Sequence, residues 1–358
     1  AKAVSGTPSA IWNLLSVFCP RDWPPPRPVV EADWYAVLRG TQALMETEQE
    51  AEVPEDEGYL IERLRTWIVQ LLAHGALPVR ERVEAGSLLN HLPGGDPRPE
   101  VTKVREIRGL DVPKGACWIG STAEGAYDDE RPQAYVEFPA FRIMKYPVTQ
   151  AQYAEFVHAK RRPAPTFEHW PEYSWRDDRP PQPPRGKENH PVVLVSFADA
   201  VAFCEWLSGQ LGFEVRLPTE GEWEYAAKGP QPREERERTY PWDGPFDAEK
   251  CNTMESGIGG TSPVGIFPQG ARPDGPHEMA GNVWEWTASV YKEYPYRRAA
   301  DDGWEGGPGN PQAIRTVRGG SWADPQGDAR CANRVGGPRP DDRSGRLGFR
   351  CCSRSPST

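Results

Sequence analysis

The most informative stretch of this chain begins with Val317-Arg318-Gly319-Gly320-Ser321-Trp322 and ends with Gly348-Phe349-Arg350-Cys351-Cys352. Between these two motifs, glycine, aromatic and arginine residues alternate with small and polar ones. Exposed positions on a scaffold whose core is held elsewhere can change at little cost, because surface substitutions usually alter stability by within ~0.5 kcal/mol. The stretch therefore predicts a rigid framework that carries a changeable surface.

Composition limits the class of protein. The chain has 358 residues, of which 37% are hydrophobic and 10% aromatic, so it can bury a sizeable core in one large domain and one small one. Its 39 prolines and 35 glycines predict much irregular structure. A formal net charge of −10 argues against nucleic acid or an anionic membrane surface as the main partner.

Location is also expected from composition. No apolar run approaches the ~20 residues that a membrane span needs, so membrane insertion is not expected. The start, Ala1-Lys2-Ala3-Val4-Ser5-Gly6, lacks the apolar core and cleavage site of a signal peptide. We therefore expect a cytoplasmic protein.

Residues 1–100 differ in texture from the rest. Apolar residues at helical spacing predict helices over 31–50, over 59–74 and from 78 or 79 to 92, where Pro93-Gly94-Gly95 ends the last one. Such a small helical module suits packing or contact with a partner protein better than catalysis.

The remainder, residues 109–354, reads as short strands and turns. Thr149 is a helix N-cap candidate for 149–157, and a second helix is expected over 199–207. Thr219 with Glu222 forms a capping box, which makes both residues structural rather than catalytic. The proline-rich segment 163–185 is expected to be a long exposed loop.

A series of motifs in this part resembles, in order, the formylglycine-generating enzyme (sulfatase-modifying factor) family. That resemblance implies an α+β fold of C-type-lectin-like architecture, with much irregular loop, preceded here by the small helical module. The motifs are Trp118-Ile119-Gly120-Ser121, Pro147-Val148-Thr149-Gln150-Ala151-Gln152-Tyr153, His190-Pro191-Val192, Arg216-Leu217-Pro218-Thr219-Glu220-Gly221-Glu222-Trp223-Glu224-Tyr225-Ala226-Ala227, Tyr240-Pro241-Trp242, Gly281-Asn282-Val283-Trp284-Glu285-Trp286-Thr287, Arg318-Gly319-Gly320-Ser321-Trp322 and Gly348-Phe349-Arg350.

The cysteines decide what the resemblance implies about catalysis. Family members that oxidise a substrate cysteine carry two active-site cysteines in the interval that corresponds to residues 323–329, which contains none here. Thiolate chemistry requires a thiol, so we predict that the chain is not an enzyme. The resemblance also implies that Cys204 and Cys351 match a disulfide pair. It further implies that Cys331 matches a structural cysteine whose usual disulfide partner position is occupied here by Ala227.

The sequence also bears on metal binding. The histidines are isolated, and His74 and His91 form no ligand cluster, so neither iron nor copper is expected. The resemblance implies a structural Ca²⁺ site made by the oxygen ligands of Glu278, Gly281, Val283 and Glu285. The alternative is that Glu285 forms a salt bridge with an arginine such as Arg318. The family's second calcium site would use Asn252, Thr253 and residues 256–258, but its expected aspartate falls on Ser256.

The C-terminal stretch, about 317–352, resembles the variable region of proteins diversified by diversity-generating retroelements, which randomise template adenines. An AAC codon varied at both adenines never encodes Lys, Glu, Gln, Met or Trp. None of these five occurs at the predicted ligand-binding positions, which are Ala323, Asp324, Pro325, Gly327, Asp328, Val335, Gly336, Gly337, Pro338, Arg339, Asp342, Ser344, Gly345 and Arg346.

We therefore predict a bacterial, non-catalytic ligand-binding protein: a retroelement variable protein that displays a hypervariable surface to a ligand expected to be a protein. Trp322 and Phe349 should fill core, Arg330, Arg334 and Arg350 should make planar multi-donor hydrogen bonds, and Trp304 or Tyr296 should lie near the surface as aromatic anchors. The alternatives are an oxidase-type enzyme of the family, and a fixed-sequence sensor of a bacterial signalling or defence protein.

Overall fold

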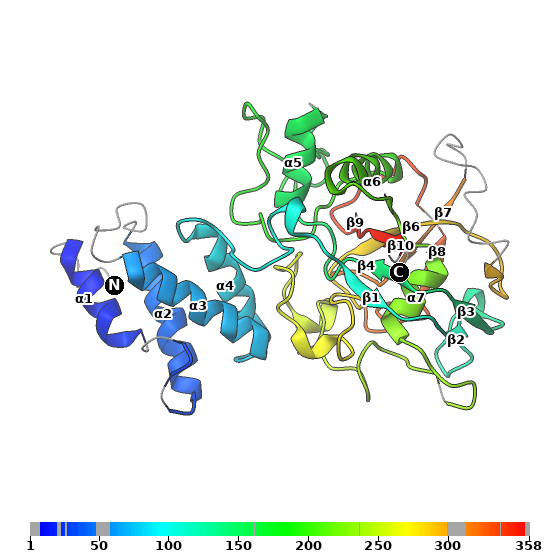
Figure 1. The fold of residues 1–358 in the computed structure, drawn as a ribbon, viewed down its shortest axis with the longest axis horizontal. Coiled ribbons are helices and arrows are strands. Elements are labelled where there is room, and N and C mark those ends of the chain that lie inside the picture. Colours follow the sequence, from blue (N-terminus) through cyan, green and yellow to red (C-terminus); the bar gives the residue numbers. More distant parts are fainter. Residues whose placement is uncertain are drawn as a thin grey trace.

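The computed structural model describes residues 8–19, 23–25, 27–47, 58–160, 162–235, 237–298, 313–336 and 338–354. The first helices lie at one end of an elongated molecule, and the strands and later helices form the other end (Figure 1). No described helix is both long enough and apolar enough to span a bilayer. The helices are α1 (Pro8–Phe18), α2 (Glu31–Glu46), α3 (Gly58–His74), α4 (Val79–His91), α5 (Gln150–Lys160), α6 (Phe197–Leu211) and α7 (Glu220–Lys228), with short 3₁₀ turns η1 (Val104–Glu106), η2 (Asp128–Glu130), η3 (Met254–Ser256) and η4 (Pro268–Gly270).

The described strands form three small sheets, ordered β1-β4-β10-β5, β2-β3 and β8-β7-β6-β9. All pairings are antiparallel except that of β6 with β9, which is parallel. Short strands, helices and long irregular connections confirm the predicted α+β fold. The strands are β1 (Leu110–Val112), β2 (Gly115–Ile119), β3 (Ala134–Phe138), β4 (Phe141–Ile143), β5 (Val215–Arg216), β6 (Trp284–Val290), β7 (Arg315–Arg318), β8 (Arg334–Gly336), β9 (Leu347–Phe349) and β10 (Cys352–Arg354).

The helices predicted in the N-terminal module are found as α2, α3 and α4, with α2 ending at Glu46 and residues 48–50 outside the described ones. Helix α1 was not predicted. It is short, and its Trp12 and Leu15 are buried in the same apolar cluster as α2 and α3. Isolated helices of this length are marginal in water, so tertiary packing rather than local sequence stabilises it.

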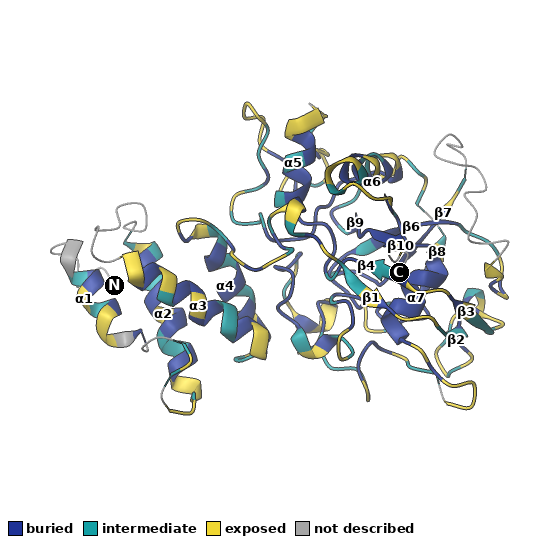
Figure 2. Ribbon diagram, in the orientation of Figure 1, coloured by how far each residue is buried: buried dark blue, intermediate teal, exposed yellow. Residues whose placement is uncertain are grey.

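The four N-terminal helices share a core with the rest of the chain. Ile266 and Phe267 belong to the buried cluster of the helices. Figure 2 shows buried residues both in helices α2, α3 and α4 and in the strand-containing end of the molecule. Arg82 of α4 is buried and donates to the carbonyl of Ile266 at 2.5 Å and to Glu249 at 2.7 Å. An ion pair and shared apolar contacts therefore hold α4 against the loop that precedes η4.

Capping explains the later helices. Thr219 Oγ1 accepts from the Glu222 amide, and the Glu222 carboxylate accepts from the Thr219 amide. These two bonds confirm the predicted capping box of α7. Helix α6 is longer than the predicted 199–207. Its N-cap is Ser196, whose hydroxyl accepts from the Asp199 amide, so the helix begins before the expected start. Gly212, with φ 78°, ends it in the left-handed region that favours glycine.

The proline-rich segment was predicted to be an exposed loop, and this was wrong in part. Tyr173 and Trp175 are 2% and 4% exposed. The Trp175 indole donates to Gln150 of α5 at 2.7 Å, which anchors the segment to the framework. Buried aromatic side chains therefore hold the middle of this loop in place, although many of its flanking residues are exposed.

Close packing of α4 gives a first prediction. A Cβ on Gly86 would stand 2.8 Å from Cβ of Pro263, whereas a Cβ on Gly209 of α6 would meet no atom within 4 Å. Glycine to alanine raises helix propensity at both positions, but overpacking typically costs about 1–3 kcal/mol. We expect Gly209→Ala to stabilise the protein and Gly86→Ala to destabilise it in chemical denaturation. Equal midpoints for the two variants would show that α4 does not pack as described.

Candidate functional site

The C-terminal stretch is fastened by buried arginines. Each of four arginines in or beside strands β7, β8 and β9 forms an ion pair with a buried carboxylate. The pairs are Arg318–Glu224 at 2.7 Å, Arg330–Glu130 at 2.7 Å, Arg334–Glu220 at 2.9 Å and Arg350–Glu285 at 2.6 Å.

Helix α7 links two of these pairs in one network. Lys228 and Glu224 are fully buried and 2.6 Å apart, one helical turn from each other. Burial lowers the pKa of Lys228, but the charge of Glu224, its hydrogen bond and the nearby Cys117 and Cys331 together outweigh this; the net shift is upward, so the ammonium stays charged. Arg318 also donates to the carbonyls of Ala332 and Asn333 at 2.9 and 3.0 Å. The network therefore holds the turn before β8 as well as β7.

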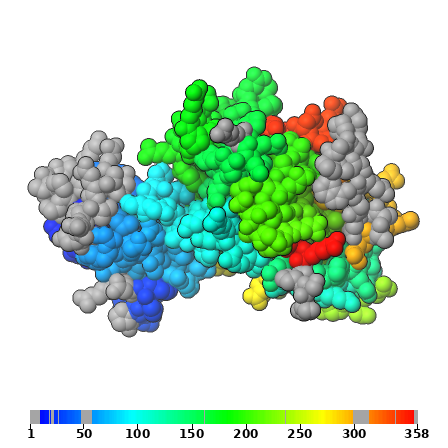
Figure 3. Space-filling model, turned by 45° about the horizontal axis from the view of Figure 1, so that its top comes forward, coloured from blue at the N-terminus to red at the C-terminus, as the bar shows by residue number. Residues whose placement is uncertain are grey.

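A groove of about 580 Å³ lies on the opposite face of the β8-β7-β6-β9 sheet. Residues from all four strands make its floor, and two loops and the proline-rich segment make its rim. Figure 3 shows that the orange-red segment around residues 338–346 reaches the molecular surface. The floor residues are Trp284, Val317, Val335 and Leu347; the rim residues are Phe167, Asp324, Asp328, Pro338, Asp341, Asp342, Arg343, Ser344 and Arg346.

Two aspartates on one side of the rim are held by the framework. Asp324 accepts from the Trp284 indole at 2.8 Å and from Ser321, and Arg346 lies 3.6 Å from it. Asp328 accepts from the Tyr127 hydroxyl at 3.1 Å. Burial raises the pKa of Asp328 above its ordinary value, the bond from Tyr127 opposes this, and the nearby charge of Asp324 adds to it. Hydrogen bonds to the framework thus keep both carboxylates at the groove edge.

The groove brings together many of the predicted ligand-binding positions. Ala323, Pro325, Gly327, Gly336, Arg339 and Gly345 do not line it, and Gly337 lies outside the described residues. Those that line it are Asp324, Asp328, Val335, Pro338, Asp342, Ser344 and Arg346.

Two predicted variable glycines are packed rather than free. A Cβ on Gly345 would stand 2.6 Å from the Trp170 ring, and one on Gly336 would stand 2.0 Å from the Tyr291 ring. A side chain at either position therefore requires an aromatic ring to move. Tyr296, expected near the surface as an anchor, is only 3% exposed and packs in the core, whereas Trp304 lies outside the described residues.

Of the two aromatic residues expected to fill the core, Phe349 does so and Trp322 does not. Phe349 is fully buried in the main core, as expected. Trp322 is only half-buried: it lies beside Tyr173, with ring centroids 6.4 Å apart, and its indole donates to the carbonyl of Gly345 at 3.2 Å. The aromatic residue of the Gly-Gly-Ser-Trp motif therefore supports the loop beside the groove rather than the central core.

Glu285, one of the residues predicted for calcium, has protein partners in this arrangement. Both oxygens of Glu285 accept from Arg350, and one also accepts from the Trp223 indole at 2.7 Å. The predicted salt bridge of Glu285 is thus made with Arg350 rather than Arg318. Burial raises the pKa of Glu278 to about 7, and one of its carboxylate oxygens is buried without a hydrogen-bond partner among the described residues. The calcium site stays a prediction.

The backbone of the predicted calcium motif is also engaged. The Gly281 carbonyl accepts from the Val283 amide at 2.9 Å. In the second predicted site, Asn252 donates to the Gly260 carbonyl at 2.9 Å and accepts from Ser256 at 3.3 Å. These bonds tie both loops internally.

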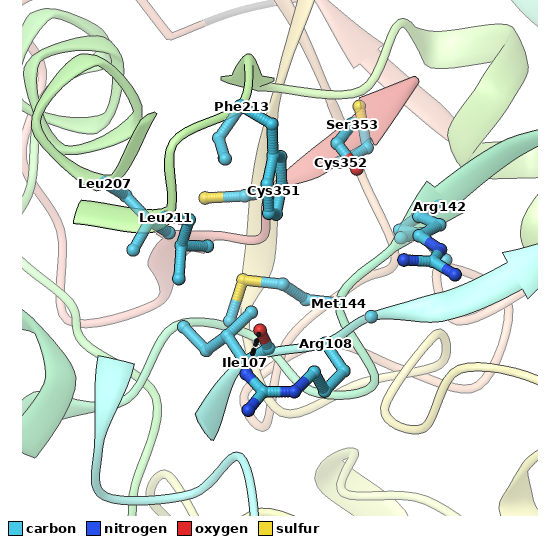
Figure 4. A pocket seen from close by; sticks show the side chains of 13 residues that line it. Ile107, Arg108, Arg142, Met144, Leu207, Leu211, Phe213, Cys351, Cys352 and Ser353 are labelled. Carbon is cyan, nitrogen blue, oxygen red and sulfur yellow. Dashed lines mark hydrogen bonds between the residues drawn. The ribbon is translucent and has the colours of Figure 1, made fainter. Parts of the chain in front are cut away.

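The cysteines lie away from the groove. The described cysteines are all buried and unbridged, and the sulfurs of Cys204 and Cys351 are 3.5 Å apart. Cys351 and Met144 line a small apolar pocket between α6 and β4 (Figure 4). Burial and then the Cys204 thiol raise the pKa of Cys351 well above its ordinary value. A disulfide between these two cysteines therefore needs only a small approach of the sulfurs, whereas Cys351 is not a ready thiolate.

Fold and groove together define a sulfatase-modifying-factor-type domain. A family model described as "Sulfatase-modifying factor enzyme 1-like domain" matches residues 99–355, and the chain belongs to this family. The inactive C-alpha-formylglycine-generating enzyme 2 of Mus musculus is 32% identical over 302 residues, covering 72% of this chain and 89% of the relative.

Further relatives have other names. The formylglycine-generating enzyme of Mycobacterium tuberculosis is 33% identical, over 53% of this chain and 75% of the relative. The hercynine oxygenase of Mycolicibacterium thermoresistibile is also 33% identical, over 55% and 47%. Among solved structures, PvdO from Pseudomonas aeruginosa has a TM-score of 0.50 at 28% identity, over 68% of this chain and 93% of that one. Treponema denticola variable protein 1 has 0.51 at 21%, over 70% and 95%.

These comparisons correct the prediction that the chain is not an enzyme. Its relatives include proteins named as formylglycine-generating enzymes and hercynine oxygenases, so the chain belongs to a family of enzymes. The earlier inference relied on one missing pair of cysteines. That absence bears on a single type of chemistry, whereas the family's named activities include more than one.

Sequence reasoning missed the carboxylates that hold the framework. Glu130, Glu220 and Glu224 each pair with an arginine about one hundred or two hundred positions away in the chain. Glu220 and Glu224 stood inside a recognised motif, but spacing alone did not reveal their partners. Phe167, which lines the groove from the proline-rich segment, carried no local signal either.

The Glu285–Arg350 pair gives a second prediction. Leucine at position 285 leaves a buried guanidinium without its carboxylate, which typically costs about 3–5 kcal/mol. We expect Glu285→Leu to lower the denaturation midpoint strongly and Glu205→Leu, an exposed change on α6, to have little effect. The wild-type midpoint measured in EGTA and in millimolar calcium tests the predicted metal site: a calcium-dependent rise that Glu285→Leu abolishes would establish the site, and equal midpoints would contradict it.

Proposed function

We propose that this chain is a ligand-binding protein that holds its ligand, expected to be a protein, in the groove over the β8-β7-β6-β9 sheet, and that the groove residues are diversified by a retroelement. One observation carries the proposal. Seven of the fourteen positions predicted to vary line one groove, while framework residues between them in the sequence, such as Arg330 and Arg334, are buried and paired.

Alternation along the strands supports a surface that can change. In β8, Arg334 is buried against Glu220 whereas its neighbour Val335 is 37% exposed at the groove. Side chains on a strand alternate between faces, so one face can be kept for the framework and the other for the ligand. Treponema denticola variable protein 1, which is named as a variable protein, has a similar fold. At 21% identity that likeness concerns the fold alone.

A second candidate is an oxidase-type enzyme, which the named activities of the relatives favour. The groove would then hold its substrate. Because residues 323–329 contain no cysteine, such an enzyme would need chemistry other than that of the thiol pair. Oxygen consumption and the copper and iron content of the purified protein distinguish this candidate from the first.

The diversification proposal makes a genetic prediction. The DNA flanking the 3′ end of the gene should hold a near-repeat of the codons for residues 323–346 that differs only at adenines, beside a reverse-transcriptase gene. Sequencing this region in several isolates checks it. An invariant gene end with no repeat would refute diversification and favour a fixed-sequence sensor or an enzyme.

The same substitution at two nearby arginines tests the division between framework and surface. Arg339 is exposed, whereas Arg334 is 1% exposed and paired with Glu220. We expect Arg339→Leu to change the free energy of unfolding by within ~0.5 kcal/mol and Arg334→Leu to lower it by about 3–5 kcal/mol. Similar losses in both variants, measured by chemical denaturation, would contradict the proposed tolerance of the surface.

A further inference from the structure

The groove combines an apolar floor with an acidic rim. Of the floor residues, Val317 and Leu347 are 2% and 4% exposed and Val335 is 37% exposed, while Phe167 at the rim is also 37% exposed. Apolar walls of this kind cover the hydrocarbon part of a ligand. The floor alone therefore does not select the charge of the ligand, and the rim must do so.

Carboxylates outnumber guanidinium groups at the rim. Four aspartates face two arginines there. Arg343 is bound elsewhere, since it pairs with Asp199 at 2.6 Å and donates to the Leu194 carbonyl at 2.8 Å. Arg346 lies 3.6 Å from Asp324 and is 42% exposed, so it offsets one carboxylate only in part. The groove thus presents an excess of negative charge.

The exposed doublet Asp341-Asp342 contributes most freely to that charge. Both side chains are exposed at the mouth of the groove. Asp342 accepts from the Arg339 amide at 2.8 Å, which fixes the turn, whereas Asp324 and Asp328, on another loop of the rim, are tied to Trp284 and Tyr127. A ligand in the groove therefore meets carboxylates from two loops.

We propose that the groove binds a basic, extended polypeptide segment, with lysine or arginine head groups at the two acidic loops of the rim and their alkyl stems on the apolar floor. This inference rests on the proposed function. Lysine and arginine are the side chains that carry a long apolar stem and a cationic head. The face of the exposed Phe167 ring adds a site for a cation. Nucleic acid is disfavoured by the charge of the rim.

Other cationic ligands fit the groove less well. A groove of about 580 Å³ is large for a single metal ion. Among the described residues, no group of three or more His, Cys, Asp or Glu side chains is placed to hold a metal. A small polyamine would satisfy the carboxylates but would leave much of the floor uncovered. Competition by spermidine separates it from a polypeptide.

The test uses random peptides displayed on phage and panned on the full chain. Binding through the groove is identified by its loss in Val335→Arg, which places a bulky side chain in the groove and reduces its negative charge. Peptides that depend on the groove should be enriched in lysine and arginine. In fluorescence anisotropy, Asp341→Asn with Asp342→Asn should weaken them about three- to tenfold, as the loss of exposed ion pairs predicts, and added salt should weaken the wild-type complex.

A matched control is available in Asp177→Asn with Asp178→Asn, an exposed aspartate doublet that does not line the groove. It makes the same change in net charge and should leave affinity unchanged; an equal loss would overturn the assignment to the groove. Groove-dependent peptides that are neutral or acidic would overturn the basic ligand and leave the proposed function standing. The absence of any groove-dependent peptide would overturn both. Spermidine that competes with micromolar affinity would overturn the polypeptide.

Discussion

Glu220 of α7 is the residue on which the C-terminal half of the fold depends. It lies 2.9 Å from Arg334 and 3.5 Å from Arg318, which are directly opposite each other on strands β8 and β7. Two like charges facing each other in a dry interior are unfavourable unless anions lie between them. Glu220, with Glu224 one turn later, supplies those anions. Helix α7 therefore fixes how the two strands lie.

The register that pairs these arginines also builds the groove. Where Arg318 faces Arg334, the neighbouring residues Val317 and Val335 face each other as well, and they project to the opposite side of the sheet. One side thus carries charges locked into the framework, and the other carries the floor of the groove. A change on the groove side leaves the ion pairs intact. This separation allows a binding surface to vary on a stable fold.

Local signals predicted much of the chain. The capping box of Thr219 and Glu222 and the periodicity of the N-terminal helices follow from contacts within a few residues, so they are readable from sequence. Helix α1 and the buried middle of segment 163–185 were not, because both depend on side chains far along the chain. The arginine partner of Glu285 was not readable for the same reason: it is Arg350, 65 positions away.

By itself the sequence determined the family and the α+β class, because these rest on motifs in a fixed order and on residue types. Only the tertiary structure decided which C-terminal positions share a groove and which, such as Gly336 and Gly345, lie under aromatic rings. It also decided which carboxylate neutralises each arginine. The physical reason is that charge pairing and groove shape arise between distant segments, and linear spacing carries no record of that proximity.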